Sequence, residues 1–406
     1  MTGTAVAQGI SIALSPVLTR LYSPKEFGLF ALYFAIASPL SVIATARYES
    51  AIMLPDKEED ALNVVALSCS ISVILGALLL LVTYLFNDSI AHLMGQEELK
   101  NWFYFVPITV MFTGVYQSLN YLANRHTAYK LLAANRITQS AIVSIINIGM
   151  GLLGFGLAGL LLANVFGQIL ATALIMINLL RLDKLKFQPI HFKGMIQQAK
   201  RYVKFPKYDI PSMFINVLAN QVPVFMLGKF FSSSIVGFYS LTNKVIGLPV
   251  NLVAGSVLDV FRQRASSDYA KHGNCEQIFK KTFKSLLTLS IAPFLVFAIF
   301  APFLFSFVFG ATWRTAGEYA QIMSVMLFFR FISSPLSYMF FVAEKQEYNF
   351  IGQCFLLLFS VGSILVGVYL HNVKVAILIF SLSYSLVYVA YLMLSYRFSK
   401  GVKNGA

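Results

Sequence analysis

Two basic residues lie in stretches of sequence that are otherwise apolar enough to cross a membrane. Lys244 lies in "VGFYSLTNKVIGLP" and Arg330 in "SVMLFFRFISSPLSY". A charge at the centre of a membrane helix costs roughly 2.5–3.5 kcal/mol on insertion scales, so such a side chain needs water, a partner or a ligand. Asp259 and Glu318, the nearest acidic residues on the same predicted helices, lie close to opposite membrane faces. The pattern therefore favours a hydrated cavity that binds an anionic substrate.

Polar side chains at a similar depth can add hydrogen bonds to such a cavity. Amides bind sugar hydroxyls, although joining neighbouring helices is their commoner role in membranes. The candidates are Gln8, Asn147, Asn216, Asn220, Gln221 and Asn243. Tyr116, Tyr239 and Tyr338 can stack on sugar rings, and packing is the more frequent role of such rings.

Charges near the predicted helix ends reach water at little cost and are weaker candidates. Arg20, in the first loop, and Arg47, at the end of the second span, extend the set of cations that can bind substrate. Glu49 can pair with Arg47, and Asp209 and Asp259 lie at other helix ends, so these three are candidates for ion-pair gates. Anchoring at the membrane interface is an equally good interpretation of Arg47 and Asp209.

Membrane-spanning helices must position these residues. With 58% hydrophobic and only 12% charged residues among 406, the chain has more apolar surface than a soluble core can hide. Windows of about 20 apolar residues, each long enough to cross the hydrocarbon layer, predict an all-α integral membrane protein with twelve spans. They are 1–19, 27–46, 61–86, 102–122, 136–156, 157–180, 208–229, 234–258, 284–309, 317–342, 349–370 and 373–396.

The basic residues of the loops predict the orientation of the spans. Loops after even-numbered spans, together with the C-terminal tail, hold 23 of the 31 Lys and Arg residues, against 6 in the odd-numbered loops. Because basic loops stay in the cytoplasm, both termini are expected there. The formal charge of +14 then reflects this bias and attraction to anionic lipids, so nucleic acid is not an expected partner.

One long basic loop divides the spans into two sets of six. Residues 1–180 and 208–396 form the expected N- and C-terminal lobes, and 397–406 form a cytoplasmic tail. The linker between the lobes, 181–207, contains "HFKGMIQQAKRYVKF", in which apolar residues follow helical spacing and basic residues fill the other side. This pattern predicts a helix that lies on the cytoplasmic membrane surface.

The two lobes repeat short motifs. "GLFAL" opens the second span at Gly28 and "GFYSL" opens the eighth at Gly237, and a proline lies on each side of both motifs. Because six spans return the chain to the same side, the repeat is parallel, a plan with which transporters build a central cavity. Prolines in the first, second, seventh and eighth spans predict bent helices that line it.

Taken together, several stretches resemble the Wzx-type polysaccharide flippases, which are related to the peptidoglycan lipid flippases and to the multidrug and toxin extruders. The resemblance is carried by "AQGISIALSPVLTRLYSPKEFGLFALY", "ARYESAI", "KFPKYDIPSMFINVLANQVPVFML", "VGFYSLTNKVIGLP" and "FGATWRTAGEYA". It implies two six-helix lobes and alternating access. It also implies transport of undecaprenyl-pyrophosphate-linked oligosaccharide across the bacterial inner membrane, for O-antigen, capsule or a related polysaccharide. Lys244 falls where related lipid flippases carry a cation, so the resemblance implies that it holds the pyrophosphate.

The remaining expectations concern partners and alternatives. Membrane lipids are expected partners, and the resemblance adds a polysaccharide polymerase and a chain-length regulator. No cofactor is expected, because the sequence has no GxxxxGK[ST] motif and its His and Cys residues lack ligand spacing; H+ and Na+ stay open as coupling ions. A multidrug or organic-cation antiporter is the alternative, although it would be expected to carry carboxylates in the cavity. A membrane polysaccharide polymerase is less favoured, because the predicted outer loops are short, and the chain is expected not to be an enzyme.

Overall fold

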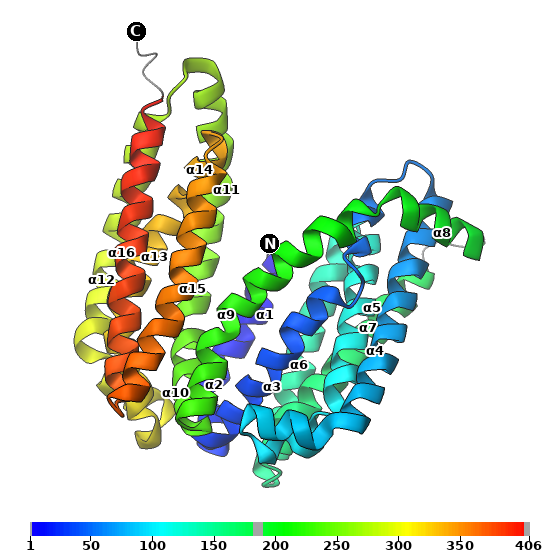
Figure 1. Cartoon of the computed structure of the whole chain (residues 1–406), viewed down its shortest axis with the longest axis horizontal. Helices are drawn as coiled ribbons and strands as arrows, with labels where there is room; N and C mark the ends of the chain where they lie inside the picture. Colours follow the sequence, from blue (N-terminus) through cyan, green and yellow to red (C-terminus); the bar gives the residue numbers. More distant parts are fainter. Residues whose placement is uncertain (1, 182–189, 402–406) are drawn as a thin grey trace. The chain divides into compact units, whose positions relative to one another are not determined.

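The structure is a computed structural model that describes residues 2–181 and 190–401. Every regular element in these ranges is a helix (Figure 1). Residues 182–189 of the predicted linker and 402–406 of the predicted tail lie outside the described residues. The first elements are α1 (Thr2–Ala13), α2 (Ser15–Leu21), α3 (Pro24–Ile43), η1 (Tyr48–Met53), α4 (Glu58–Met94), η2 (Glu97–Trp102), α5 (Phe105–Arg125), α6 (Tyr129–Leu152), α7 (Leu157–Leu180), α8 (Phe192–Arg201), η4 (Phe205–Asp209) and α9 (Ile210–Phe230). They are followed by α10 (Ser233–Thr242), η5 (Asn243–Gly247), α11 (Leu248–His272), α12 (Glu276–Phe309), η6 (Ala311–Trp313), α13 (Arg314–Leu336), α14 (Met339–Val342), α15 (Gln346–Tyr369) and α16 (Val373–Ser399).

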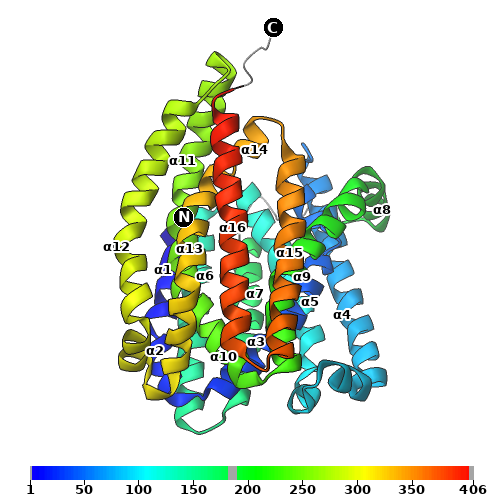
Figure 2. The same cartoon turned by 60° about the vertical axis from the view of Figure 1, so that its left-hand side comes forward.

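By its internal contacts the chain forms two compact units, unit 1 (Met1–Gly237) and unit 2 (Phe238–Ala406). In unit 1, α9 packs on α3, although the sequence assigns that segment to the second lobe. In unit 2, α13 packs against both α12 and α16, and Figure 2 shows these three helices side by side. The lobe boundaries drawn from the sequence stay a prediction.

Ten helical stretches in the described residues are long and apolar enough to cross a membrane, so the chain is an all-α integral membrane protein, as predicted. The two other predicted spans are also helical. The first, 1–19, is divided at Leu14 into two short helices, α1 and α2. The span 102–122 corresponds to α5, which has the length of a span but is too polar to count among the ten. The total of twelve stays a prediction.

Proline marks a change of helix geometry in two of the four spans in which it was predicted to bend the helix. The first span breaks just before Pro16, because this residue has no N–H to continue the α-helical ladder. The eighth changes to a π-helical turn, η5, just before Pro249. Pro39 and Pro223 instead lie inside the continuous helices α3 and α9. Bends in the second and seventh spans therefore stay a prediction.

The glycines of the two repeated motifs lie against each other inside unit 1. A Cβ atom on Gly28 would overlap the backbone carbonyl oxygen of Ser233, and one on Gly237 would overlap that of Pro24. The same Cβ positions lie only 3.0 and 3.1 Å from the backbone nitrogens of Gly237 and Gly28, respectively. Only a pair of glycines lets two membrane helices approach this closely. The glycines repeated in the sequence therefore form one crossing, between the starts of α3 and α10.

The amphipathic segment of the linker forms a helix, α8, which packs on α4 in unit 1. The Gln198 amide donates to Oδ1 of Asp60 at 2.6 Å. Phe192 and Ile196 remain 76% and 42% exposed on another part of its surface. Exposed apolar side chains beside a basic face fit the predicted position on the membrane surface, which stays a prediction.

Candidate functional site

The first group of candidate residues lies in the turn that joins α3 to η1. Ala46 and Arg47 both have a left-handed backbone, with φ of +49° and +62°. For residues other than glycine this conformation costs on the order of 1 kcal/mol or more, and it persists where surrounding contacts fix it. The contacts of the Arg47 side chain provide that restraint.

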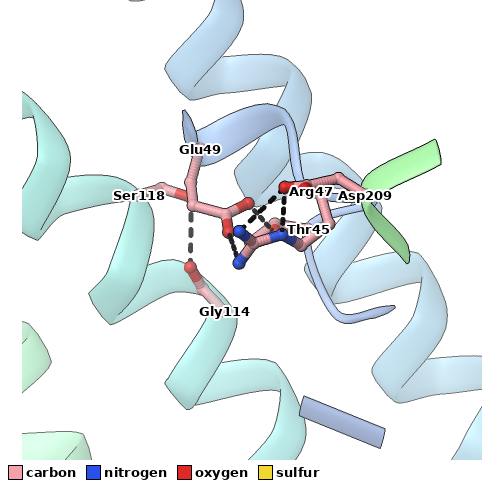
Figure 3. Close-up of polar contacts among 6 residues, drawn as sticks. All are labelled: Thr45, Arg47, Glu49, Gly114, Ser118 and Asp209. Carbon is pink, nitrogen blue, oxygen red and sulfur yellow. Dashed lines mark hydrogen bonds and ion pairs between the residues drawn. The ribbon is translucent and has the colours of Figure 1, made fainter. Parts of the chain in front are cut away.

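The Arg47 guanidinium binds two carboxylates, as Figure 3 shows. Its Nε and Nη2 donate to Oδ2 of Asp209 at 3.0 and 2.9 Å, and its Nη1 donates to Oε1 of Glu49 at 2.9 Å. Asp209 is the last residue of the π-helical turn η4, immediately before α9. The ion pair therefore connects the end of α3 to the start of α9, across 162 positions of sequence.

Glu49 is the most buried member of this group, with only 1% of its surface exposed. Its second oxygen accepts a hydrogen bond from the Thr45 hydroxyl, so both carboxylate oxygens have partners. Beneath it, Gly114 lets α5 approach the end of α3, because a Cβ atom there would lie 2.9 Å from Cβ of Ala44. Arg47 is neutralised by two acids, an arrangement that suits a closing contact between helices better than an open anion site.

The second group lies in unit 2, around Lys244. Pro249 has no N–H to donate to the carbonyl of Val245, and the preceding turn widens into the π helix η5, which contains Lys244. Single π turns inside membrane helices often occur at functional sites. The Asn243 amide donates to the Tyr239 carbonyl at 3.2 Å and so ties the wide turn to the helix before it.

Lys244 and Arg330 are both half-buried, and neither has a carboxylate within ion-pair distance among the described residues. Arg330 lies on α13, which packs against η5. Its guanidinium interacts electrostatically with the phenols of Tyr239, Tyr384 and Tyr388. The cations are thus accompanied by aromatic and amide groups rather than by acids.

Tyr384 and Tyr388 were missed by the sequence reasoning. They lie one turn apart on α16, with ring centroids separated by 6.2 Å, and Tyr384 also contacts Phe380 at 4.2 Å. The signal that could have found them is the spacing of Tyr384, Tyr388 and Tyr391, which places three phenols on one face of a helix.

Two other predicted charged residues form no ion pair with Arg47, Glu49 or Asp209 among the described residues. Arg20 is exposed in the last turn of α2, and no ion pair involves it within the described ranges. Asp259 pairs with Arg262, one turn along the same helix, at 3.4 Å. The structure therefore brings Arg47, Glu49 and Asp209 together but leaves Asp259 in a local contact.

The amide candidates divide into buried and exposed residues. The side-chain oxygens of Gln8 and Asn147 are buried and have no hydrogen-bond partner among the described residues. Asn216 and Asn220 are exposed on α9, where the Asn220 amide donates to the Asn216 carbonyl at 2.8 Å, and Gln221 is half-buried. Because buried polar atoms are normally paired, the oxygens of Gln8 and Asn147 are the ones best placed to accept a ligand or water.

Sequence comparison assigns the family. The family model described as "Polysaccharide biosynthesis protein" matches residues 17–318, and the chain belongs to this family. It is 24% identical to the succinoglycan biosynthesis transport protein ExoT of Rhizobium meliloti over 256 residues, which are 62% of this chain and 49% of that protein. It is 20% identical to the teichuronic acid biosynthesis protein TuaB of Bacillus subtilis over 269 residues, 65% of this chain and 54% of that protein. The chain thus aligns with about half the length of the curated relatives that it matches.

Solved structures share the fold. The inward closed conformation of the lipid II flippase MurJ superposes with a TM-score of 0.77 at 16% identity, covering 97% of this chain and 87% of that one. The multidrug transporter DinF-BH has a TM-score of 0.68 at 15% identity, covering 97% of this chain and 93% of that one. With its apolar helices and its family, the chain is a multi-pass protein of the bacterial inner membrane.

Proposed function

We propose that this protein is a flippase that moves an oligosaccharide linked to undecaprenyl pyrophosphate from the cytoplasmic to the periplasmic leaflet. The observation that carries the proposal is the pair Lys244 and Arg330, which are half-buried within membrane spans and have no acidic partner among the described residues. A pyrophosphate supplies the missing negative charge and accepts charge-assisted hydrogen bonds from both side chains. The family and the relative named as a transport protein support this role.

The groups around Arg330 suit the saccharide part of such a substrate. Tyr239, Tyr384 and Tyr388 supply aromatic rings and hydroxyls, and the Asn243 amide lies beside Lys244 in the wide turn. Aromatic rings bind the apolar faces of sugars, and phenols and amides bind their hydroxyls. A bare phosphate has no sugar ring or sugar hydroxyls for these residues to bind, so they favour an oligosaccharide headgroup.

Arg47 has a different part in the proposal. Its ion pairs close the contact between the end of α3 and the start of α9 inside unit 1. In an alternating-access cycle this contact opens on one side and forms again, and the two carboxylates hold the arginine in the closed arrangement. Glu49 and Asp209 are therefore gate residues, and the substrate charge is bound at Lys244 and Arg330.

The organic-cation antiporter is the second candidate, and the likeness to multidrug transporters supports only the shared fold. A cation substrate needs acidic groups, whereas the charged pair in unit 2 is basic. The polymerase and the chain-length regulator stay proposed partners, and H+ and Na+ stay proposed coupling ions. We also propose that the protein moves the sugar without making or breaking covalent bonds in it.

Complementation tests the function. A strain without its own oligosaccharide flippase is supplied with the protein or with Lys244→Ala, Arg330→Ala or Lys374→Ala, and surface glycan is scored at equal protein levels. Lys374 is a suitable control because it is paired with Glu318 at 2.9 Å. We expect glycan to be lost in the first two variants and kept in the third. Full glycan in both Lys244→Ala and Arg330→Ala would overturn the proposal.

A further inference from the structure

A cavity of about 720 Å3 lies at one end of unit 2, uppermost in Figure 2, where the ends of α11 and α16 meet the starts of α12 and α15. Leu394 and Phe398 of its wall belong to the hydrophobic cluster around Phe340 and Tyr391. The backbone N–H of Cys275 donates to the Ser399 carbonyl at 2.8 Å and ties two of the four segments together. The cavity is therefore built on packed and hydrogen-bonded elements.

The charge of this cavity is positive. Lys345, Arg397 and Lys400 line it, and Glu276 is the single acid among its described lining residues. Glu276 is already occupied, because it accepts from the Tyr396 hydroxyl at 2.9 Å and pairs with Lys280 at 2.8 Å.

Two of the three lining cations have no acidic partner in the part of the chain that the structure describes. Lys345 has a carboxylate only at 3.9 Å, from Glu347, whereas Arg397 and Lys400 have none within ion-pair distance among the described residues. The Glu276 carboxylate interacts with Lys400 only electrostatically, at longer range. The Lys400 ammonium instead lies 4.3 Å from the centre of the Tyr396 ring. These cations are available to an anion.

An apolar stripe on α16 leads to the cavity. Leu382, Leu386 and Met393 are 51%, 70% and 63% exposed. They continue at helical spacing into Arg397 and Lys400, so all five side chains lie on one face of the helix. A long apolar surface that ends in a cationic cavity matches a molecule with an acyl chain and an anionic head.

We propose that this cavity binds the phosphate of an anionic phospholipid whose acyl chain lies along the stripe on α16. Basic pockets between membrane helices bind anionic headgroups in this way, and the sequence predicts that this end of the helices faces the cytoplasmic leaflet. The site is separate from Lys244 and Arg330, so it binds a resident lipid and not the transported one.

Lipid retention on the purified full-length protein tests the site. Delipidated protein is titrated with phosphatidylglycerol or phosphatidylcholine, and bound lipid is counted by native mass spectrometry. The double variant Arg397→Gln/Lys400→Gln should bind the tightest phosphatidylglycerol roughly 30-fold more weakly, because each surface charge contributes about a factor of five to anionic-lipid attraction. The control Lys374→Gln, at the opposite end of α16, should bind it like the unchanged protein.

Three results would overturn the proposal: equal retention of phosphatidylcholine, an equal loss in Lys374→Gln, or unchanged binding in the double variant. A fourth arm adds undecaprenyl phosphate. If it displaces the phosphatidylglycerol at equal mole fraction, the cavity belongs to the transported lipid and the assignment to a resident phospholipid is wrong. Lys244→Ala should leave phosphatidylglycerol retention unchanged, which separates this test from that of the proposed function.

Discussion

The crossing of Gly28 and Gly237 makes a quantitative prediction, because each glycine leaves no room for a methyl group. In Gly28→Ala the new Cβ would overlap the Ser233 carbonyl oxygen, so the helices would have to separate by roughly 2 Å to restore van der Waals distance. Overpacking of this kind costs about 1–3 kcal/mol. The unfolding entropy grows with chain length, so for a chain of 406 residues a loss at the upper end of this range lowers the melting temperature by about 3 °C.

Thermal unfolding of the detergent-purified protein measures this effect. Gly149→Ala is the matched control, because this helical glycine has nothing within 4 Å of its Cβ position and alanine favours a helix by up to about 1 kcal/mol. We expect Gly28→Ala and Gly237→Ala to melt below the unchanged protein and Gly149→Ala to melt at or above it. The double variant should lose less than the sum of the two single losses, because both substitutions open the same crossing. Equal melting of Gly28→Ala and Gly149→Ala would refute the reasoning.

Two further predictions concern the ion pairs and the orientation. Arg47→Gln should destabilise the protein by about 3–5 kcal/mol, because it leaves the buried Glu49 carboxylate without its cation. The double variant Arg47→Gln/Glu49→Gln should recover most of this loss. Thermal unfolding of both variants checks the prediction, and an equal loss of stability in the two would contradict it. For orientation, after removal of Cys69 and Cys354, a cysteine at Ile190 should react with an impermeant maleimide only from the cytoplasm, and one at Glu97 only from the periplasm. The native Cys275 is a suitable internal control, because it is 2% exposed and burial raises the pKa of its thiol to about 11, so it should stay unlabelled in both at pH 7. Labelling with the opposite sidedness would overturn the predicted orientation.

Much of the fold could be predicted because apolar length determines a membrane helix almost by itself. Ten of the predicted spans are recovered, and the repeated glycines were visible as motifs. Their mutual contact was not visible, because periodicity within each helix says nothing about which helices cross. For the same reason the sequence could not show that α9, which it assigns to the second lobe, packs on α3.

The candidate site was predictable in part for the same physical reason. A cation within a membrane span stands out in the sequence, so Lys244 and Arg330 could be found from depth alone. The pairing of Arg47 with Asp209 could not, since the two residues are 162 positions apart and the sequence left each open as a gate residue or an interfacial anchor. Tyr384 and Tyr388 were also missed, because a tyrosine in a membrane helix is common and only its position beside Arg330 gives it meaning.

The most direct test of the central claim is binding of undecaprenyl pyrophosphate to the purified protein in detergent, measured by native mass spectrometry. A hydrogen bond to a charged group contributes about 1.5–3 kcal/mol, so Lys244→Ala and Arg330→Ala should each bind roughly 10- to 100-fold more weakly. Lys374→Ala, which removes a cation that already has an acidic partner, should bind like the unchanged protein. Equal affinity in all four proteins would contradict the account.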